Sequence, residues 1–303
     1  MTMKRTDFPK GLEEGLNAHF GLEYKEHMEE WRGCYDVETS DKAFEEDQLI
    51  TGFGAAQVKV EGDTVAYDDG QEGWTARYTH ETIALAFRIT EEAVEDHLYY
   101  RLGPKYARAL ARAMQHTKEI KGAAVFNNAT TAGYTGGDAK TLLATDHPLL
   151  GGGTFSNKLS TPADLSETSI EDLLIQIRKA VDDRSVPIAL RPKSLIIPPD
   201  LEYTATRLLR SVLRTGTGDN DINAIKSLGI FKSDPMVVTR LTDADAWFIR
   251  TDINDGLKHI VRKKISNGKE QDFETGDWRY KARERYIFGW SDPRGVYGSE
   301  GAA

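Results

Sequence analysis

A single apolar pattern at helical spacing runs through the first half of the chain and limits the folds open to it. Thr90 precedes two glutamates, an arrangement that caps a helix, and large apolar side chains then recur three or four residues apart as far as Ile120. The pattern continues through Pro104, which marks either a kink or the first turn of a second helix. About 37 residues at 1.5 Å rise would span ~55 Å. A helix of this length favours an extended subunit.

The segment before this helix has a different pattern. Apolar and polar residues alternate with a period of two, and Gly- and Asp-rich turns separate the runs. We expect strands over Ala56–Val60, Thr64–Tyr67, Trp74–Tyr78 and Ile83–Ile89. Their apolar content is too low for a separate core, so we predict a long β-arm that rests on a neighbour. The chain before Asp47 is rich in Glu, and we expect it to be irregular with short helical pieces such as Lys10–Phe20.

A compact α/β region follows the long helix. We expect it to begin near Asp164, with a capping box at Thr168–Glu171 opening an amphipathic helix. The further elements that we expect are helices over Leu201–Leu213 and Asp221–Leu228, strands over Ser194–Ile197, Val237–Val238 and Ala246–Ile249, and alternating strands from Leu257 to Trp290.

Charge and cysteine content exclude several classes of protein. The 303 residues carry a net charge of −9, and a protein whose main task is nucleic-acid binding usually shows a basic excess instead. Most of the acid lies in residues 1–100, which hold 9 Lys or Arg and 23 Asp or Glu. The single cysteine, Cys34, excludes an intramolecular disulfide. No apolar run approaches the ~18 residues that a membrane span needs.

Motifs that carry chemistry are missing. The chain has no Gly-x-Ser-x-Gly elbow, no phosphate loop, no dinucleotide fingerprint and no His-x-x-x-His pair. Asp146-His147 is the one fragment that resembles a catalytic pair, but Pro148 follows it and the setting reads as a structural turn. Cys34 has no basic neighbour and reads as a packing residue. We therefore expect no enzyme activity, no cofactor and no metal site.

The order of arm, β-loop, long helix, α/β region and returning strands resembles the major capsid protein of tailed bacteriophages, which has the Hong Kong 97-type fold. The short sequence motifs within these segments are similar to those of the Mu-like major head subunit family. The segments that carry the resemblance, in their shared order, are Ile50–Gly54, Tyr78–Glu81, Arg88–Glu92, Asp146–Leu149, Gly151–Asn157, Arg191–Pro199, Asn220–Ala224, Asp245–Phe248, Tyr280–Arg285 and Phe288–Gly295.

This resemblance implies an α+β subunit with four parts. They are an N-terminal arm (1–46), an extended β-loop (47–82), a peripheral domain with the long spine helix (83–163 and 257–303), and an axial α/β domain (164–256). It implies a major head protein of the virion, made in the host cytoplasm, that assembles as hexamers and pentamers into an icosahedral shell around double-stranded DNA without sequence-specific binding. The implied partners are other copies, a separate scaffolding protein, a portal and decoration proteins, and no membrane. The first 46 residues lack a long charged helix, so we expect no fused scaffold.

Uneven charge suggests where subunits meet. The loop is acidic from Val60 to Ala76, with no Lys or Arg, whereas four basic residues of the predicted spine helix fall on one helical face. In the family's architecture the loop lies over a neighbouring subunit near its spine helix. The expected inter-subunit contacts are therefore Asp68, Asp69, Glu72, Trp74, Arg101, Lys105, Arg108 and Arg112. Solvated basic residues, basic residues that face the DNA, and pairs within the helix with Glu95 and Asp96 remain alternatives.

Two other functions stay open at this stage. An encapsulin-like shell that houses enzymes would share the fold class, and a solitary α/β hydrolase is the enzymatic rival, against which the missing nucleophile motif argues. Microscopy of the purified protein separates shells from a monomer.

Overall fold

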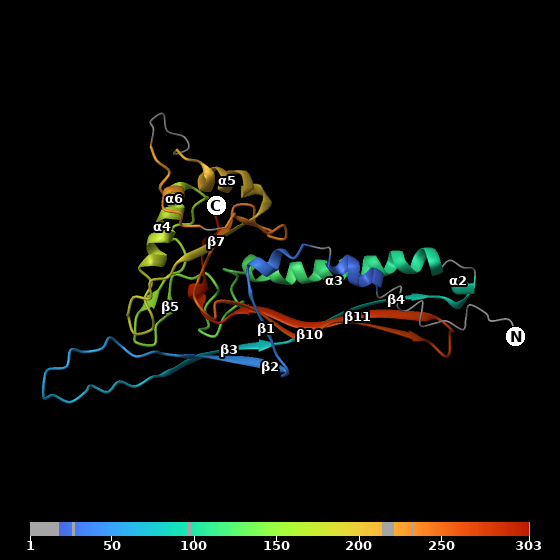
Figure 1. Ribbon diagram of the computed structural model, residues 1–303, viewed down its shortest axis with the longest axis horizontal. Helices are drawn as coiled ribbons and strands as arrows, with labels where there is room; N and C mark the ends of the chain where they lie inside the picture. Colours follow the sequence, from blue (N-terminus) through green and yellow to red (C-terminus); the bar gives the residue numbers. More distant parts are fainter. Residues whose placement is uncertain (1–17, 26–27, 96–98, 214–220, 232, 303) are drawn as a thin grey trace.

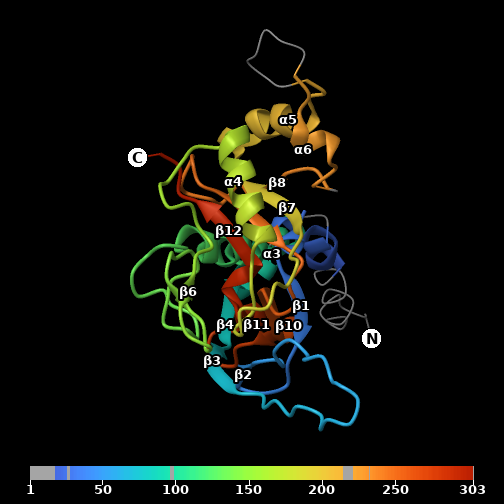
Figure 2. The same cartoon turned by 90° about the vertical axis from the view of Figure 1, so that its left-hand side faces the viewer.

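The computed structural model describes residues 18–25, 28–95, 99–213, 221–231 and 233–302. Figure 1 shows an α/β region at one end, a long helix lying along a sheet, and a thin loop that projects from the opposite side of the sheet. Figure 2, turned by 90°, shows the α/β region above the sheet and the loop below it. The expected extended subunit is confirmed.

A long twisted sheet forms the centre of the chain. It has the order β1-β10-β11-β4, with β1 parallel to β10 and the other neighbours antiparallel. Its strands are β1 (Asp36–Thr39), β4 (Glu81–Ile89), β10 (Leu257–Gln271) and β11 (Trp278–Trp290). The predicted strand over Ile83–Ile89 is confirmed as β4. The chain before Asp47, predicted to be irregular with short helical pieces, contains the strand β1, because β10, far along the chain, pairs with it. Most of the predicted helical piece Lys10–Phe20 lies outside the described residues.

Helix α3 (Tyr99–Asn127) covers one face of this sheet, and α2 (Glu91–Glu95) precedes it. Its 29 residues include Pro104, which lies in the first turns and does not end the helix. Ala107, Leu110 and Met114 are buried against Ile89 and Tyr280 of the sheet. The predicted long helix is therefore confirmed over Tyr99–Asn127, and residues 96–98, between α2 and α3, lie outside the described residues.

The α/β region surrounds a second four-stranded sheet of order β12-β9-β7-β8, and one apolar cluster joins it to its helices. The strands are β7 (Pro192–Ile197), β8 (Met236–Val237), β9 (Trp247–Thr251) and β12 (Val296–Ser299). The helices of this region are α4 (Glu167–Arg178), α5 (Glu202–Arg210) and α6 (Ala224–Ser227). Short 3-10 turns occur elsewhere along the chain, at η2 (Glu30–Gly33), η3 (Pro199–Leu201) and η4 (Pro293–Gly295). β5 (His147–Pro148) and β6 (Thr154–Phe155) form a small ribbon.

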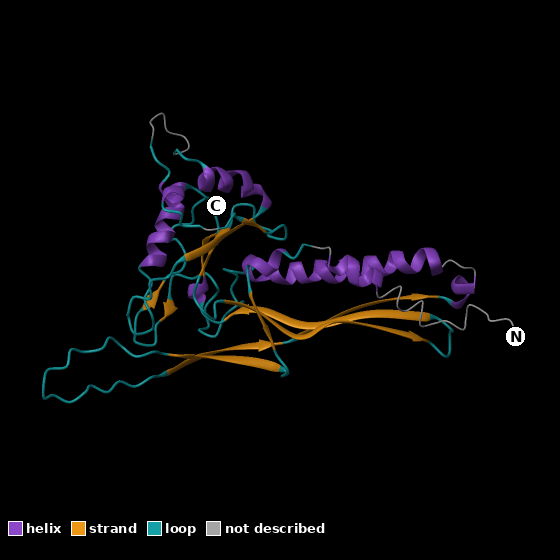
Figure 3. Ribbon diagram, in the orientation of Figure 1, coloured by secondary structure: helices purple, strands orange, loops and turns teal. Residues whose placement is uncertain are grey.

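Two local predictions need correction. The cap of α4 is Ser166, which exchanges hydrogen bonds with Ser169, so the helix starts earlier than a box at Thr168–Glu171 would place it. The strands predicted over Ala56–Val60 and Thr64–Tyr67 do not form. Instead β2 (Phe44–Ile50) pairs with β3 (Glu72–Thr79), and residues 51–71 between them form a loop (Figure 3). Alternation alone does not make a strand when no second strand lies beside it.

Candidate inter-subunit surfaces

The extended loop, residues 51–71, leaves large apolar side chains in solvent. Val58 and Tyr67 are 95% and 96% exposed, and Phe53, Val60 and Val65 are each more than half exposed. Figure 1 shows the loop passing under the α/β region and extending beyond it. An exposed apolar group of this size on one projecting segment is typical of a surface that another protein covers.

One contact ties this loop to its own subunit. Arg184 Nη1 donates to both carboxylate oxygens of Asp68, at 2.7 and 2.9 Å, and its Nη2 donates to the carbonyl of Asp69. The Gly54 N–H also donates to Asp68, at 2.7 Å. These hydrogen bonds, first from Gly54 and then from Arg184, hold the pKa of Asp68 below its usual value. Asp68 therefore has a partner within the chain that no sequence pattern indicated, whereas Asp69 and Glu72 keep exposed carboxylates.

The root of the loop is held by a buried lysine. Lys258 Nζ lies 2.6 Å from Asp47, 2.7 Å from Asp255 and 3.4 Å from Glu38. Burial opposes the charge of this lysine, but the hydrogen bonds to Asp255 and Asp47 outweigh burial and raise its pKa. Ser291 donates to Asp47 at 2.6 Å, so the network joins β2 to the end of β11.

Trp74, another predicted contact residue, is half-buried beside this network. It lines a cavity of about 380 Å³ together with Asp47 and Lys258. Its ring therefore belongs to the root of the loop and not to the projecting tip.

The basic residues of α3 divide into three groups. Lys105 and Arg108 are exposed, and no carboxylate of the described part of the chain pairs with either. Arg112 is paired with Glu23 of the N-terminal arm, Nε to Oε1 at 3.0 Å. The side chain of Arg101 lies outside the described residues, as do those of Glu95 and Asp96.

The N-terminal arm is clamped to α3 by buried polar groups. Lys118 and Tyr24 both contact the buried carboxylate of Glu284, at 3.4 and 3.2 Å. Glu119 accepts the backbone N–H groups of Glu30 and Trp31, at 3.1 and 3.2 Å. Burial raises the pKa of Glu119 to about 7. These contacts hold Tyr24, Glu30 and Trp31 against the body of the subunit.

A second basic surface lies on the sheet face opposite α3. On β11, Tyr280, Ala282, Glu284 and Tyr286 are buried, and the residues between them point the other way because side chains alternate along a strand. We call these residues the basic ladder: Arg279, Lys281, Arg283 and Arg285. The sequence R-Y-K-A-R-E-R contained the signal, a basic residue at every second position, but not which face it occupies.

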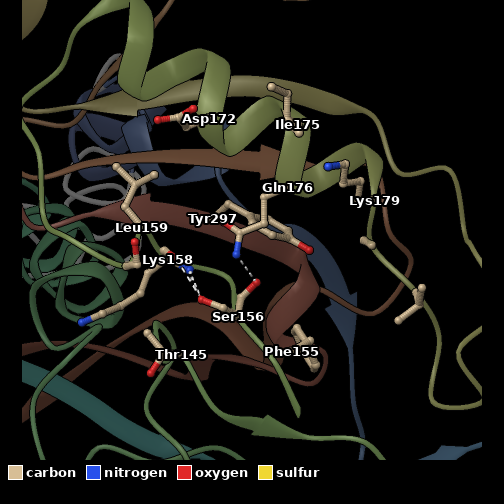
Figure 4. A pocket seen from close by; sticks show the side chains of 13 residues that line it. Thr145, Phe155, Ser156, Lys158, Leu159, Asp172, Ile175, Gln176, Lys179 and Tyr297 are labelled. Atoms are coloured by element: carbon tan, nitrogen blue, oxygen red, sulfur yellow. Dashed lines mark hydrogen bonds between the residues drawn. The ribbon is translucent and has the colours of Figure 1, made fainter. Parts of the chain in front are cut away.

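A cavity of about 670 Å³ lies between α4 and the chain around β6 (Figure 4). Gln176 Nε2 donates to the Ser156 carbonyl at 2.7 Å across it, and Lys158 and Lys179 stand at its rim. No histidine or cysteine is among the residues that line it.

The Asp146-His147 fragment is not a catalytic pair. His147 is fully buried, and its Nδ1 lies 2.6 Å from Asp138, while Asp146 pairs with Lys140. The other ring nitrogen faces Asn157 Oδ1 at 3.2 Å. The structural interpretation of His147 is confirmed, in a short strand and not in a turn.

Cys34 is also buried, and burial raises the pKa of its thiol to about 12. The thiol therefore stays protonated and packs as an apolar residue, as predicted.

The described residues form neither a metal-holding cluster nor a membrane-spanning helix. They contain no group of three or more His, Cys, Asp or Glu side chains arranged to hold a metal ion. None of their helices combines the length and the apolar character that a membrane crossing requires.

Comparison with known proteins gives both a family and structural neighbours. Residues 72–299 match the family described as phage capsid protein. A virus-like particle from Pyrococcus furiosus is 13% identical, with a TM-score of 0.53 over 94% of this chain and 98% of that chain. The Mycobacterium phage Adephagia structure has 10% identity and a TM-score of 0.54, over 91% of each chain. The procapsid of bacteriophage JBD30 has 14% identity and a TM-score of 0.51, over 98% of this chain and 76% of that chain. No curated protein matches.

Proposed function

The chain belongs to the phage capsid protein family, and from this premise we propose that it is the major head subunit, assembling as hexamers and pentamers into an icosahedral shell around double-stranded DNA. Membership of this family makes it a structural protein of the virion and not an enzyme. The Hong Kong 97-type fold expected from the resemblance is confirmed by neighbours that share most of the chain at TM-scores above 0.5.

The extended loop is the observation that supports self-assembly most directly. Five of its large apolar side chains are more than 60% exposed, and the chain itself offers them no core. Covering such side chains with a second subunit would remove that apolar surface from water. In a closed shell every loop has such a neighbour, so the same contact repeats throughout.

The four parts of the subunit then take distinct roles. We assign residues 1–46 to the arm and 47–82 to the extended β-loop, which includes most of the β2–β3 hairpin and the loop 51–71. Residues 83–163 and 257–303 then form the peripheral domain, and 164–256 form the axial domain at the five- and six-fold axes. The exposed Val212, Leu213 and Ile222 at the far end of the axial domain support contacts between copies there. A Mu-like origin, a separate scaffolding protein, a portal and decoration proteins belong to the same proposal.

The predicted loop contacts fit this arrangement in part. Asp69 and Glu72 present free carboxylates to a neighbour, and Lys105 and Arg108 present free charges on the spine helix. Asp68 and Arg112 would first have to leave Arg184 and Glu23.

An encapsulin-like compartment is the second candidate. The match to the virus-like particle from Pyrococcus furiosus covers 98% of that particle's chain, which supports a shell-forming subunit of this fold as an alternative. The nature of the cargo in purified particles, nucleic acid or protein, separates the two.

Negative-stain microscopy of the purified protein tests the proposal. We expect closed shells or capsomers, and expect Val58→Asp to reduce the assembled fraction at least about tenfold, because it puts a charge into the covered apolar surface. The matched control is Gln57→Asp, which adds the same charge at the preceding residue, an exposed polar one, and should assemble. A compact, stable monomer under every assembly condition would refute the proposed function.

A further inference from the structure

A small apolar cluster packs the β2–β3 hairpin against the central sheet, and three basic side chains lie beside it. The members of the cluster are Ala76 and Tyr78 of β3, Ile260 of β10 and Ile287 of β11. His80, Arg262 and Arg285 each stand two positions along the chain from one of these members. Side chains two positions apart on a strand lie on the same face of a sheet. All three basic residues are therefore expected on the face under the hairpin, next to the cluster.

The neighbours of these residues point the other way, toward α3. Glu81, which follows His80, pairs with Lys121 of α3 at 2.7 Å. Glu284 and Tyr286, on either side of Arg285, both contact Lys118 of α3. Because side chains alternate along a strand, His80 and Arg285 lie on the opposite face from α3.

An irregularity in β10 concentrates positive charge at this place. Val261 is opposite Tyr286 and Lys263 is opposite Arg285, so Arg262 is an extra residue between the two pairs. A bulge of this kind sets two residues of one strand against one of the next. Like charges opposite each other are unfavourable. Among the described residues, no carboxylate forms an ion pair with Arg262, Lys263 or Arg285.

The acid that acts on this group most directly is already engaged. Glu45 of β2 accepts a hydrogen bond from Ser40 at 2.5 Å and another from Lys42 at 3.2 Å. These two hydrogen bonds lower the pKa of Glu45, so its carboxylate is charged but directed to other partners. The cations beside His80 are therefore left without a counter-ion of their own.

Buried hydrogen-bonding groups without partners mark the same place. His80 is only 6% exposed, yet neither of its ring nitrogens bonds to any group of the described chain. The Nε atoms of Arg262 and Arg285 are likewise buried without a partner. Burial lowers the pKa of His80, and the charges of Arg285 and Arg262 lower it further, against an opposing contribution from Glu45. Leaving such groups unpaired costs free energy, which an anion with several acceptor oxygens would recover.

We propose that His80, Arg262 and Arg285 form a binding site for a free tetrahedral oxyanion of the phosphate and sulfate class, at the bend where β3 passes into β4. Guanidinium groups bind such oxygens through paired hydrogen bonds, and both arginines are half-buried, so their outer ends reach solvent. The β2–β3 hairpin lies over this face (Figure 1) and leaves no width for a duplex, which favours a free anion over a phosphate of DNA. A bound anion would tie the root of the extended loop to β10 and β11.

Calorimetric titration of unassembled subunits with sodium sulfate, at ionic strength held constant with chloride, tests the site. We expect saturable binding of a single sulfate. Arg262→Gln with Arg285→Gln should weaken it at least about tenfold, because two charge-assisted hydrogen bonds are lost. The matched control is Lys281→Gln with Arg283→Gln, which removes two cations from the same face of the sheet outside the site and should change the affinity by no more than about twofold.

The pH dependence of sulfate binding tests the role of His80. Sulfate keeps its charge between pH 5.5 and 7.5, whereas a bound anion favours the charged form of the ring. Binding should therefore tighten at least about threefold as pH falls through this range, and His80→Gln should abolish the change. Glu45 stays ionised throughout because its pKa is lowered. Glu119 does titrate here, but it lies on α3 across the sheet and is retained in the His80→Gln variant.

Each result bears on one conclusion, once circular dichroism and urea midpoints have shown that the variants fold. Should the glutamine pair not fold, Arg262→Lys with Arg285→Lys keeps both charges without the paired donors and should still weaken binding. Absence of saturable binding, or equal binding by the parent and the arginine variants, overturns the site. A pH dependence that persists in His80→Gln removes the histidine from it. Displacement of sulfate by a short DNA duplex would overturn the free anion as ligand. Subunits that bind sulfate and yet form no particles contradict the proposed function alone.

Discussion

Asn157 holds three segments of the chain together, and replacing it tests how much its buried hydrogen bonds stabilise the fold. Its side-chain nitrogen donates to the carbonyls of Leu142, Pro293 and Val296, at 2.6, 3.0 and 3.0 Å. Its Oδ1 accepts from the Ala144 N–H at 2.9 Å. Because the side chain is fully buried, water does not replace it at these sites in the folded subunit.

The expected cost of Asn157→Ala follows from those contacts. The Ala144 N–H donates to the Asn157 side chain, and the Leu142 carbonyl accepts from it. Both residues are buried. At about 1–3 kcal/mol for each buried group left unpaired, we expect a loss of about 3–5 kcal/mol in the free energy of unfolding. The control is Asn128→Ala, which removes one hydrogen bond to Ala124 at the end of α3 and should cost only about 0.5–1.5 kcal/mol.

Urea denaturation of unassembled subunits, followed by the fluorescence of buried tryptophans such as Trp247, measures both variants. Asn157→Leu provides a second comparison, because it keeps most of the volume and removes every hydrogen bond, and it should be nearly as destabilised as the alanine variant. The reasoning is refuted if Asn157→Ala costs no more than Asn128→Ala. A stable Asn157→Leu would show that lost volume, and not lost hydrogen bonds, caused the effect.

Three further predictions concern buried charges. The pKa of Glu119 is about 7 in the folded state against 4.5 in the unfolded chain, so the folded state binds this proton more tightly and the free energy of unfolding falls as pH rises from 4.5 to 7. In urea titrations from pH 5 to 7, Glu119→Gln should flatten this dependence on pH. An unchanged slope in the variant would contradict the prediction. Lys118→Met leaves the Glu284 carboxylate buried without its cation and should cost about 3–5 kcal/mol, and recovery in a Lys118→Met, Glu284→Leu double variant is measured in the same titrations. Lys258→Met should destabilise the subunit by a similar amount and speed proteolysis of residues 51–71. The control Lys140→Met removes an exposed ion pair and should cost at most about 1 kcal/mol. If Lys258→Met and the parent are cleaved at equal rates, Lys258 is not the residue that holds the loop.

Elements with a strong local pattern could be predicted from the sequence. The spacing of Leu110 and Met114 identified α3, and the run Ser194–Ile197 identified β7. The boundaries of α5 and α6 were narrower than predicted, because Ser211 leaves helical geometry and Asn223 caps the second helix. Such elements depend on residues a few positions apart, which a sequence displays directly.

Contacts between distant segments could not be predicted in this way. The pairing of β1 with β10, the bond between Asp68 and Arg184 and the position of His147 beside Asp138 and Asn157 join residues whose proximity no local pattern records. The loop shows the opposite failure. Its alternation is typical of a strand, but a strand also needs a hydrogen-bonding neighbour, and within one chain β2 and β3 already pair with each other.

Residue order alone was enough to predict the acidic loop, the long helix, the order of the elements and the resemblance to a capsid subunit. Which face of the sheet carries exposed basic residues, by contrast, depends on how the distant elements pack. Alternation along residues 279–285 puts the basic residues on one side of β11 in any sheet, but it was the packing of α3 on the other side that left this side open. Either face of a sheet can be the buried one, and long-range packing decides which face is covered.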